Sequence, residues 1–286
     1  MIVARTIEEV RDAVSAARKA GAKIGLVPTM GFLHEGHLSL IKVARKSGAD
    51  FIVVSIFVNP KQFGPGEDFA RYPRDEDGDR TLLGKENVDV LFMPEAEVMY
   101  PPGATTTVSV GAIAKPLEGE RRPGHFDGVA VVVLMLFNIV QPDIAVFGRK
   151  DAQQCAVIDR MVRDLNVPVQ LVFGATIREH DSVAMSSRNS YLSADERELA
   201  PVLHRALRAG EEAVKHGVED VDEVERLMQR MAAETSGVAV DYLALVDPAT
   251  FQRPADFRRD LLIAGALRIG RTRLIDNIFI DRKLIP

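Results

Sequence analysis

The sequence predicts an α/β protein in which a doubly wound parallel sheet is followed by a smaller α+β domain. Short apolar runs alternate with amphipathic helical stretches as far as residue 176, the order expected when helices connect parallel strands. The run at residues 51–58 is apolar on both faces, which is typical of a strand buried between two layers of helices. The alternation stops near residue 176, so we expect domains at residues 1–176 and 177–286.

The composition indicates a globular protein of the cytoplasm. Hydrophobic residues make up 47% of the chain and charged residues 27%, and the mean hydropathy is +0.01. No apolar run approaches the roughly 20 residues that span a bilayer, and the first residues lack the pattern of a signal peptide. The net charge of −5 provides no general attraction for polyanions, so we expect neither a nucleic-acid nor a membrane partner. Cys155 is the only cysteine, and its apolar helical surroundings predict a buried thiol.

Capping and periodicity predict the elements of the first domain. Thr6 and Glu9 form a possible capping box before a helix over residues 7–20, which Gly21 ends. We expect strands at residues 23–27, 51–58, 88–93, 144–147 and 169–173. We expect further helices at residues 36–47, 75–86, 128–140 and 151–165.

The second domain has a different pattern. Ser193 and Glu196 form another capping box, which leads one long charged helix. A linker around residues 216–222 and an amphipathic helix that ends near residue 235 follow it. Three runs close the chain, at residues 238–246, 261–267 and 272–280, and they predict a small antiparallel sheet.

The most informative segment is the turn at residues 26–37. An apolar strand leads to Gly31, and His34 and His37 stand where the next helix should begin. The first N–H groups of a helix lack intrahelical partners and bind anions, most often phosphate. The spacing of Gly31 and Gly36 is that of a P-loop, but the lysine and the serine or threonine of a P-loop are replaced. The two histidines could ligate a metal, yet no third ligand is evident, so we interpret them as hydrogen-bond donors to phosphate.

Polar side chains also follow the strand predicted at residues 51–58. Asn59 and Gln62 are neutral donors and acceptors, suited to the hydroxyl and carboxylate groups of a small substrate. The alternative is that they only cap the loop. From the residues alone, both interpretations stay open.

Two later loops carry cations beside hydrogen-bonding groups. Lys150 stands just before a helix start that Asp151 could cap, and either Gln153 or Gln154 could face a ligand. Residues 183–189 combine two hydroxyls with a guanidinium, which can bind pyrophosphate but are also ordinary turn residues. Loops at the carboxyl ends of parallel strands meet at one rim of the sheet. We therefore expect these groups to converge.

Six motifs occur in order along the chain: PTMGFLHEGH at residues 28–37, SIFVNPKQF at 55–63, YPR at 72–74, RPGHF at 122–126, KDAQQ at 150–154 and MSSRN at 185–189. Together they closely resemble the pantothenate synthetase family, the AMP-forming pantoate:β-alanine ligases, over about residues 3–280. The resemblance implies a Rossmann-like sheet of the nucleotidylyltransferase type. It also implies an enzyme that condenses pantoate with β-alanine through a pantoyl adenylate, consuming ATP and releasing AMP and pyrophosphate.

The resemblance assigns site residues by motif. The residues expected to bind ATP are Met30, Gly31, Phe32, Leu33, His34, Glu35, Gly36, His37, Gly148, Arg149, Lys150, Asp151, Ile177, Met185, Ser186, Ser187 and Arg188. Those expected to bind pantoate are Gln62, Gln154, Pro28 and Met30, and Gln62 would also bind β-alanine. His37, together with His34, Lys150 and Arg188, is expected to be catalytic by stabilising charge on the phosphates. The resemblance decides between Gln153 and Gln154.

The same resemblance implies the partners of the chain. Mg²⁺ should arrive with ATP, although its ligands cannot be named from the sequence. We expect a homodimer, and the C-terminal domain could close over the site as a lid. Arg149 stands where the family often has glutamate, and Ala152 where it often has an aromatic residue. We expect Arg149 to pair with a nearby acid.

Two other functions stay open. A nucleotidyltransferase on the same scaffold would join a nucleotide to a phosphorylated molecule, but it would need a basic acceptor pocket where Asn59, Gln62 and Gln154 are neutral. A nucleotide-binding regulatory module would bind ATP without turnover. Pyrophosphate exchange with added carboxylates separates these functions.

Overall fold

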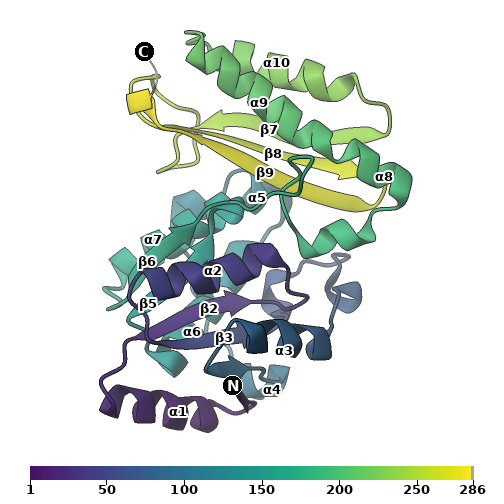
Figure 1. Cartoon of the computed structure of the whole chain (residues 1–286). Helices are drawn as coiled ribbons and strands as arrows, with labels where there is room; N and C mark the ends of the chain where they lie inside the picture. Colours follow the sequence, from purple (N-terminus) through teal and green to yellow (C-terminus); the bar gives the residue numbers. More distant parts are fainter. Residues whose placement is uncertain (285–286) are drawn as a thin grey trace. The chain divides into compact units, whose positions relative to one another are not determined.

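The computed structural model describes residues 1–284, and they divide into two compact units (Figure 1). The first unit contains Met1–Arg149 and Gln154–Ala175. The second contains Lys150–Gln153 and the chain from Thr176 onward. In the described chain, no helix combines the length and the apolar character needed to cross a membrane.

The first unit contains a six-stranded sheet in which every neighbouring pair is parallel. The strand order is β1-β4-β3-β2-β5-β6. The strands are β1 (Ile2–Ala4), β2 (Ile24–Thr29), β3 (Phe51–Ile56), β4 (Val90–Phe92), β5 (Ile144–Gly148) and β6 (Gln170–Gly174). The predicted parallel sheet is confirmed. The edge strand β1 was not predicted, because three residues are too short to show a period.

Helices cover both faces of this sheet. They are α1 (Ile7–Lys19), α2 (Glu35–Lys46), α3 (Glu76–Lys85), α4 (Ala96–Met99), α5 (Glu118–Arg121), α6 (His125–Val140) and α7 (Ala152–Asp164). Val53 of β3 packs in a cluster with residues of α1, α6 and α7, whereas its neighbours Ile52 and Val54 pack with residues of α2 and α3. Alternate residues of the strand thus enter different cores, and both must be apolar. This explains why the run at residues 51–58 shows no polar face.

The structure corrects the start of α6. The sequence predicted a helix from residue 128, but α6 begins at His125, and Gly128 lies inside it. A Cβ atom on Gly128 would stand 2.2 Å from the carbonyl oxygen of Lys61. The glycine therefore allows a close approach between α6 and the chain after β3, and it does not mark a helix start.

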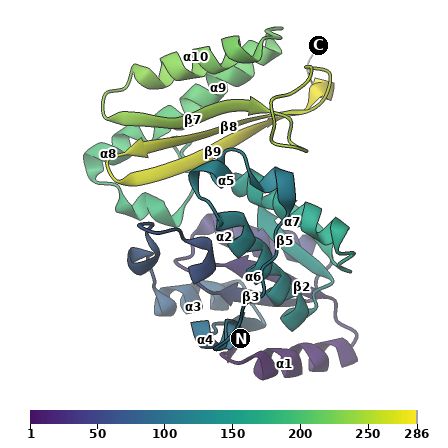
Figure 2. The same ribbon diagram turned by 180° about the vertical axis from the view of Figure 1, so that it is seen from behind.

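The second unit contains two long helices, one short helix, a 3₁₀ turn and an antiparallel sheet. They are α8 (Ala194–Leu199), α9 (Pro201–Lys215), α10 (Val221–Ala233), the 3₁₀ turn η5 (Ser187–Tyr191), and the strands β7 (Val238–Val246), β8 (Leu261–Ile269) and β9 (Thr272–Ile280). Figure 2 shows α9 and α10 side by side on one face of the sheet, whose pairs are antiparallel as predicted. The single long helix expected after Ser193 is wrong. Helix α8 ends at Leu199 and α9 starts at Pro201, because proline has no N–H for the preceding turn.

Candidate active site

The turn after β2 has an unusual backbone. Gly31 and Phe32 both have positive φ values, 84° and 51°, and this conformation is unfavourable for a residue with a side chain. A Cβ atom on Gly31 would lie 2.9 Å from Ile56. The hydroxyl of Thr29 donates to the carbonyl of Ser55 on β3 (2.8 Å) and accepts the N–H of Gly31 (3.2 Å). The turn is thereby fixed to two neighbouring strands.

A carboxylate from α3 holds the same turn. Asp79 Oδ2 accepts the N–H of Phe32 (2.8 Å), and Oδ1 accepts the N–H of Leu33 (2.6 Å). Asp79 is only 3% exposed. Burial raises the pKa of Asp79, and the two backbone hydrogen bonds oppose that rise. Sequence reasoning missed Asp79, because it is one of several acids at the start of a charged helix.

An open hollow of about 480 Å³ lies between this turn and the first residues of α3. Phe32 and Leu33 line one side, and Asp75, Asp77 and Asp79 line the other. Three carboxyl groups make this hollow unsuited to a triphosphate. An anion bound by this turn, as the sequence predicts, would therefore have to lie at the start of α2 and not in this hollow.

Both predicted histidines cap α2. His34 is the N-cap residue, and its Nδ1 accepts the N–H of Gly36 (3.1 Å). His37 Nδ1 in turn accepts the N–H of His34 (3.3 Å), and the two ring centroids lie 4.0 Å apart. A neutral imidazole whose Nδ1 accepts carries its hydrogen on Nε2. Each ring can thus cap the helix with one nitrogen and donate to a phosphate oxygen with the other.

The amide of Gln62 lies next to the histidine turn. Its Nε2 contacts the sulfur of Met30 (3.3 Å), and its Oε1 accepts from Asn59 Nδ2 (3.0 Å). Asn59 is 1% exposed, caps the 3₁₀ turn η1 (Pro60–Gln62) and accepts from the hydroxyl of Tyr100 (2.8 Å). Burial raises the pKa of Tyr100 to about 12, so this hydroxyl stays protonated and remains a donor. Asn59 thus has the capping role that the sequence left open, and it also orients Gln62.

A second set of side chains holds the backbone of Gln62. His125 Nδ1 donates to the carbonyl of Gln62 (2.9 Å), and Arg122 donates to His125 Nε2 (3.0 Å). Glu67 accepts two hydrogen bonds from Arg122, at 3.0 and 2.7 Å. Burial and the neighbouring Arg122 cation lower the pKa of His125 to about 4, so the ring is neutral at pH 7. The motif at residues 122–126 was one of those that carried the resemblance, but its residues were given no role in the site, and their contact with Gln62 was not predicted.

At the end of β5, the predicted residues fall into different environments. The thiol of Cys155 is buried as expected, 3.3 Å from the carbonyl of Gly148. Asp151 ends the 3₁₀ turn η4 (Arg149–Asp151), with its carboxylate 3.6 Å from Lys150 Nζ. Gln153 is buried, whereas Gln154 is half-buried. The exposure supports Gln154 as the residue that can meet a ligand.

In the second unit, the predicted residues lie in and after one closed loop. The N–H of Met185 donates to the carbonyl of Ile177 (3.0 Å), which closes the loop. Ser186 caps η5 by accepting the N–H of Arg188 (3.3 Å). Ser187 is buried, and Ser186 and Arg188 are half-buried. The loop thus presents a hydroxyl and a guanidinium from neighbouring positions.

Comparison with known proteins decides the family. Residues 2–279 match the family model described as pantoate-beta-alanine ligase. The chain belongs to the pantoate-beta-alanine ligase family. It is 49% identical to a pantothenate synthetase from Caldicellulosiruptor bescii over 99% of this chain and 100% of that protein. It is 50% identical to one from Herpetosiphon aurantiacus over 97% of this chain and 99% of that protein.

Solved structures of the pantoate-beta-alanine ligase family share the fold. The crystal structure of pantothenate synthetase from Thermus thermophilus has a TM-score of 0.92 and 47% identity, covering 97% of this chain and 99% of that chain. A pantoate-beta-alanine ligase from Francisella tularensis, complexed with beta-gamma ATP and beta-alanine, has a TM-score of 0.80, 34% identity and 97% coverage of each chain. The resemblance and the predicted fold class are therefore confirmed.

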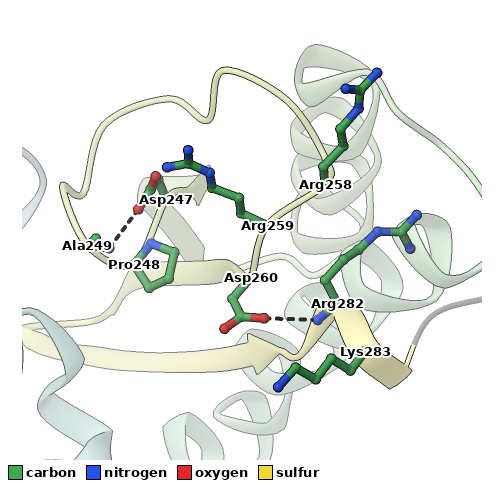
Figure 3. Close-up of a pocket in the computed structure, with 8 residues that line it drawn as sticks. All are labelled: Asp247, Pro248, Ala249, Arg258, Arg259, Asp260, Arg282 and Lys283. Atoms are coloured by element: carbon green, nitrogen blue, oxygen red, sulfur yellow. Dashed lines mark hydrogen bonds between the residues drawn. The ribbon is translucent and has the colours of Figure 1, made fainter.

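Another hollow of this ligase-family chain is lined by none of the predicted site residues. It has a volume of about 500 Å³, and its lining residues are Asp247, Pro248, Ala249, Arg258, Arg259, Asp260, Arg282 and Lys283. Figure 3 shows the four cationic side chains extending in different directions, and they do not converge on a common point. Asp247 and Asp260 accept backbone N–H groups from Ala249 and Arg282. This arrangement lacks the convergent donors of an anion site.

Proposed function

We propose that this chain condenses pantoate with β-alanine to form pantothenate, AMP and pyrophosphate, with a pantoyl adenylate as intermediate. The observation that carries the proposal is the contact between Met30 and Gln62. It joins the turn expected to bind ATP to the amide expected to bind pantoate. An enzyme that links a carboxylate to the α-phosphorus needs these two groups side by side.

The first step requires charge stabilisation and no covalent bond to the enzyme. A carboxylate oxygen of pantoate attacks the α-phosphorus of ATP, and pyrophosphate leaves with the bonding electron pair. The Nε2–H groups of His34 and His37 can donate to phosphate oxygens as negative charge moves toward the leaving group. We assign Lys150 and Arg188 the same electrostatic role.

The second step requires an oriented acyl adenylate and little water. The neutral amine of β-alanine attacks the acyl carbon and loses a proton to solvent, the bond to the bridging oxygen breaks, and AMP leaves with that oxygen and its electron pair. Gln62 is 8% exposed and held by Asn59, so its amide can fix the substrate carboxylate with little reorganisation. We assign Gln154 to pantoate as well, and the half-buried Pro28 and Met30 to its geminal methyl groups. Exclusion of water protects the reactive intermediate.

Mg²⁺ is assigned to the substrate and not to a protein site. Within residues 1–284, no group of three or more histidine, cysteine, aspartate or glutamate side chains is arranged to hold a metal ion. We propose that the ion is carried mostly by the phosphate oxygens of ATP and by water. We propose no step that depends on a protein ligand to the metal.

Several expectations from the sequence stay predictions. These are the homodimer, the closure of the C-terminal domain, the cytoplasmic location, the domain boundary at residue 176 and an acidic partner for Arg149. The side chain of Arg149 is exposed.

Pantoate-dependent exchange of labelled pyrophosphate into ATP tests the proposed function. We expect exchange with pantoate alone, and AMP in stoichiometric amounts once β-alanine is added. Transfer of AMP to a phosphorylated acceptor instead would favour a nucleotidyltransferase. If ATP binds but no carboxylate supports exchange, the chain is a regulatory module and the proposal is wrong.

A further inference from the structure

Two neighbouring polar residues of β9 contact segments that are distant in sequence. Asn277 Nδ2 donates to the carbonyl of Lys150 (2.8 Å). Asp276 accepts from both terminal nitrogens of Arg178, at 2.6 and 2.9 Å. All four residues belong to the second unit. The two contacts therefore reach the Lys150 turn and the loop that starts at Ile177.

The contact with Arg178 orders the whole loop. Arg178 also donates to the carbonyl of Ser182 (3.1 Å), and it forms an isolated antiparallel bridge with Ala184. The next residue, Met185, closes the loop on Ile177. The position of Arg178 thus determines where the chain enters the segment from Ser186 to Arg188.

Both side chains are energetically unfavourable at these positions of a strand. Asparagine and aspartate are disfavoured in strands, yet they lie side by side in β9. Asp276 is 4% exposed. Burial raises the pKa of Asp276, but the nearby His204 ring and the two hydrogen bonds from Arg178 outweigh it, so the pKa lies below its usual value. Asp276 thus remains ionised, and its charge is retained for the pair with Arg178.

We propose that Asp276 and Asn277 are positioning residues for ATP, with Asn277 holding the Lys150 turn and Asp276 holding the loop at residues 177–185. One strand of the C-terminal sheet then positions two segments that bind the nucleotide. This inference rests on the proposed function, because it takes Lys150, Ile177 and residues 185–188 as ATP contacts.

The test measures binding of β,γ-methylene ATP by calorimetry in the full chain. Asn277→Ala removes the donor to the Lys150 carbonyl, so we expect the Kd of the analogue to rise about threefold to tenfold. The Kd of pantoate should stay unchanged. Asn277→Asp keeps the size of the side chain but replaces the donor with an oxygen, and it should weaken nucleotide binding at least as much. Asn277→Asp takes the place of Asn277→Ala in this test if the alanine variant does not fold.

The Asp241–Arg273 pair provides a matched control. It joins β7 to β9 in the same sheet with a contact of 2.7 Å, and both side chains are largely buried. Asp241→Asn should lower the melting temperature and leave nucleotide binding unchanged. An equal loss of nucleotide binding in Asp241→Asn would show that the effect of Asn277 is only structural, and would overturn the proposal.

The Lys150→Ala variant distinguishes the positioning role of Asn277 from the assignment of Lys150 as an ATP contact. If Asn277 acts through Lys150, then Asn277→Ala should cause no further loss in the Lys150→Ala background. If the losses of nucleotide binding in the two single variants add fully in the double variant, the positioning role is overturned. It is also overturned if Asn277→Ala binds the nucleotide as the wild type does. If Lys150→Ala itself binds the analogue normally, Lys150 is not an ATP contact. The positioning role of Asn277 is then wrong as well, because it depends on Lys150. Pantoate-dependent exchange in the wild-type chain then shows that the function still stands.

Discussion

At the scale of single residues, the ring of His37 has two separable tasks. Its Nδ1 accepts the N–H of His34 and caps α2, and its Nε2 carries the hydrogen that we assign to the ATP phosphates. The sequence predicted a helix start with two histidines, but it did not predict that the histidines are the caps. Serine, threonine and aspartate are the usual capping residues, so the imidazole rings were interpreted only as hydrogen-bond donors to phosphate.

His37→Asn should separate these tasks. The side-chain oxygen of asparagine can replace Nδ1 as acceptor, but its NH2 group then lies near the place of Cδ2 and does not reach the position of the Nε2–H donor. We expect pantoate-dependent pyrophosphate exchange to fall about 100-fold to 1,000-fold, with the melting temperature close to that of the wild type. His37→Ala loses the cap as well and should cost about 1 kcal/mol of stability. Near-normal exchange in His37→Asn would contradict the role of Nε2.

The roles of two other site residues could not be found from the sequence, for a physical reason. Asp79 contacts a turn 47 positions earlier in the chain, and His125 contacts a carbonyl 63 positions earlier. Their partners are backbone groups, which carry no side-chain pattern. In contrast, His34 and Gln62 were predicted as candidates because each follows an apolar strand of a parallel sheet.

At the scale of elements, the fit between α6 and η1 determines where Gln62 stands. Gly128 is the point of closest approach, and a Cβ there would lie 2.2 Å from the Lys61 carbonyl oxygen and 2.7 Å from Gln62 Cα. Both neighbours are backbone atoms, which cannot move aside as a flexible side chain can. The strands and most helices were predicted from periodicity, but a contact of this kind depends on two elements at once.

Gly128→Ala should displace η1 and weaken the pantoate site. We expect the KM for pantoate in the exchange reaction to rise about tenfold and the free energy of unfolding to fall by about 1–3 kcal/mol. Gly84→Ala is the matched control, since a Cβ atom on this glycine of α3 meets nothing within 4 Å. The control should be neutral or stabilising by up to about 1 kcal/mol. An unchanged KM in Gly128→Ala would contradict the account of Gln62.

At the scale of the whole molecule, the two units have separate cores. His125 belongs to the first unit, and Asp276 to the second. The sequence predicted a change of architecture near residue 176, and an antiparallel sheet does follow the parallel one. It could not predict that Lys150–Gln153 joins the second unit, because four residues show no change of composition.

The lowered pKa of His125 predicts an acid-sensitive first unit. The ring has a pKa of about 4 in the folded chain and about 6.5 when unfolded, so between these values only the unfolded chain takes up the proton. The stabilisation is complete above pH 6.5 and is lost as the pH falls toward 4, by about 3 kcal/mol. Urea unfolding followed by circular dichroism suits a chain with no tryptophan. His125→Asn should unfold with a smaller pH dependence, and an equal dependence would contradict the assignment.

The most direct test of the central claim is the fate of the pantoate carboxylate oxygens. If the carboxylate attacks the α-phosphorus and β-alanine then attacks the acyl carbon, the bridging oxygen remains on AMP. With pantoate labelled by ¹⁸O in its carboxylate, mass spectrometry should find one labelled oxygen in each AMP formed. Unlabelled AMP, or label in the pyrophosphate, would contradict a pantoyl adenylate.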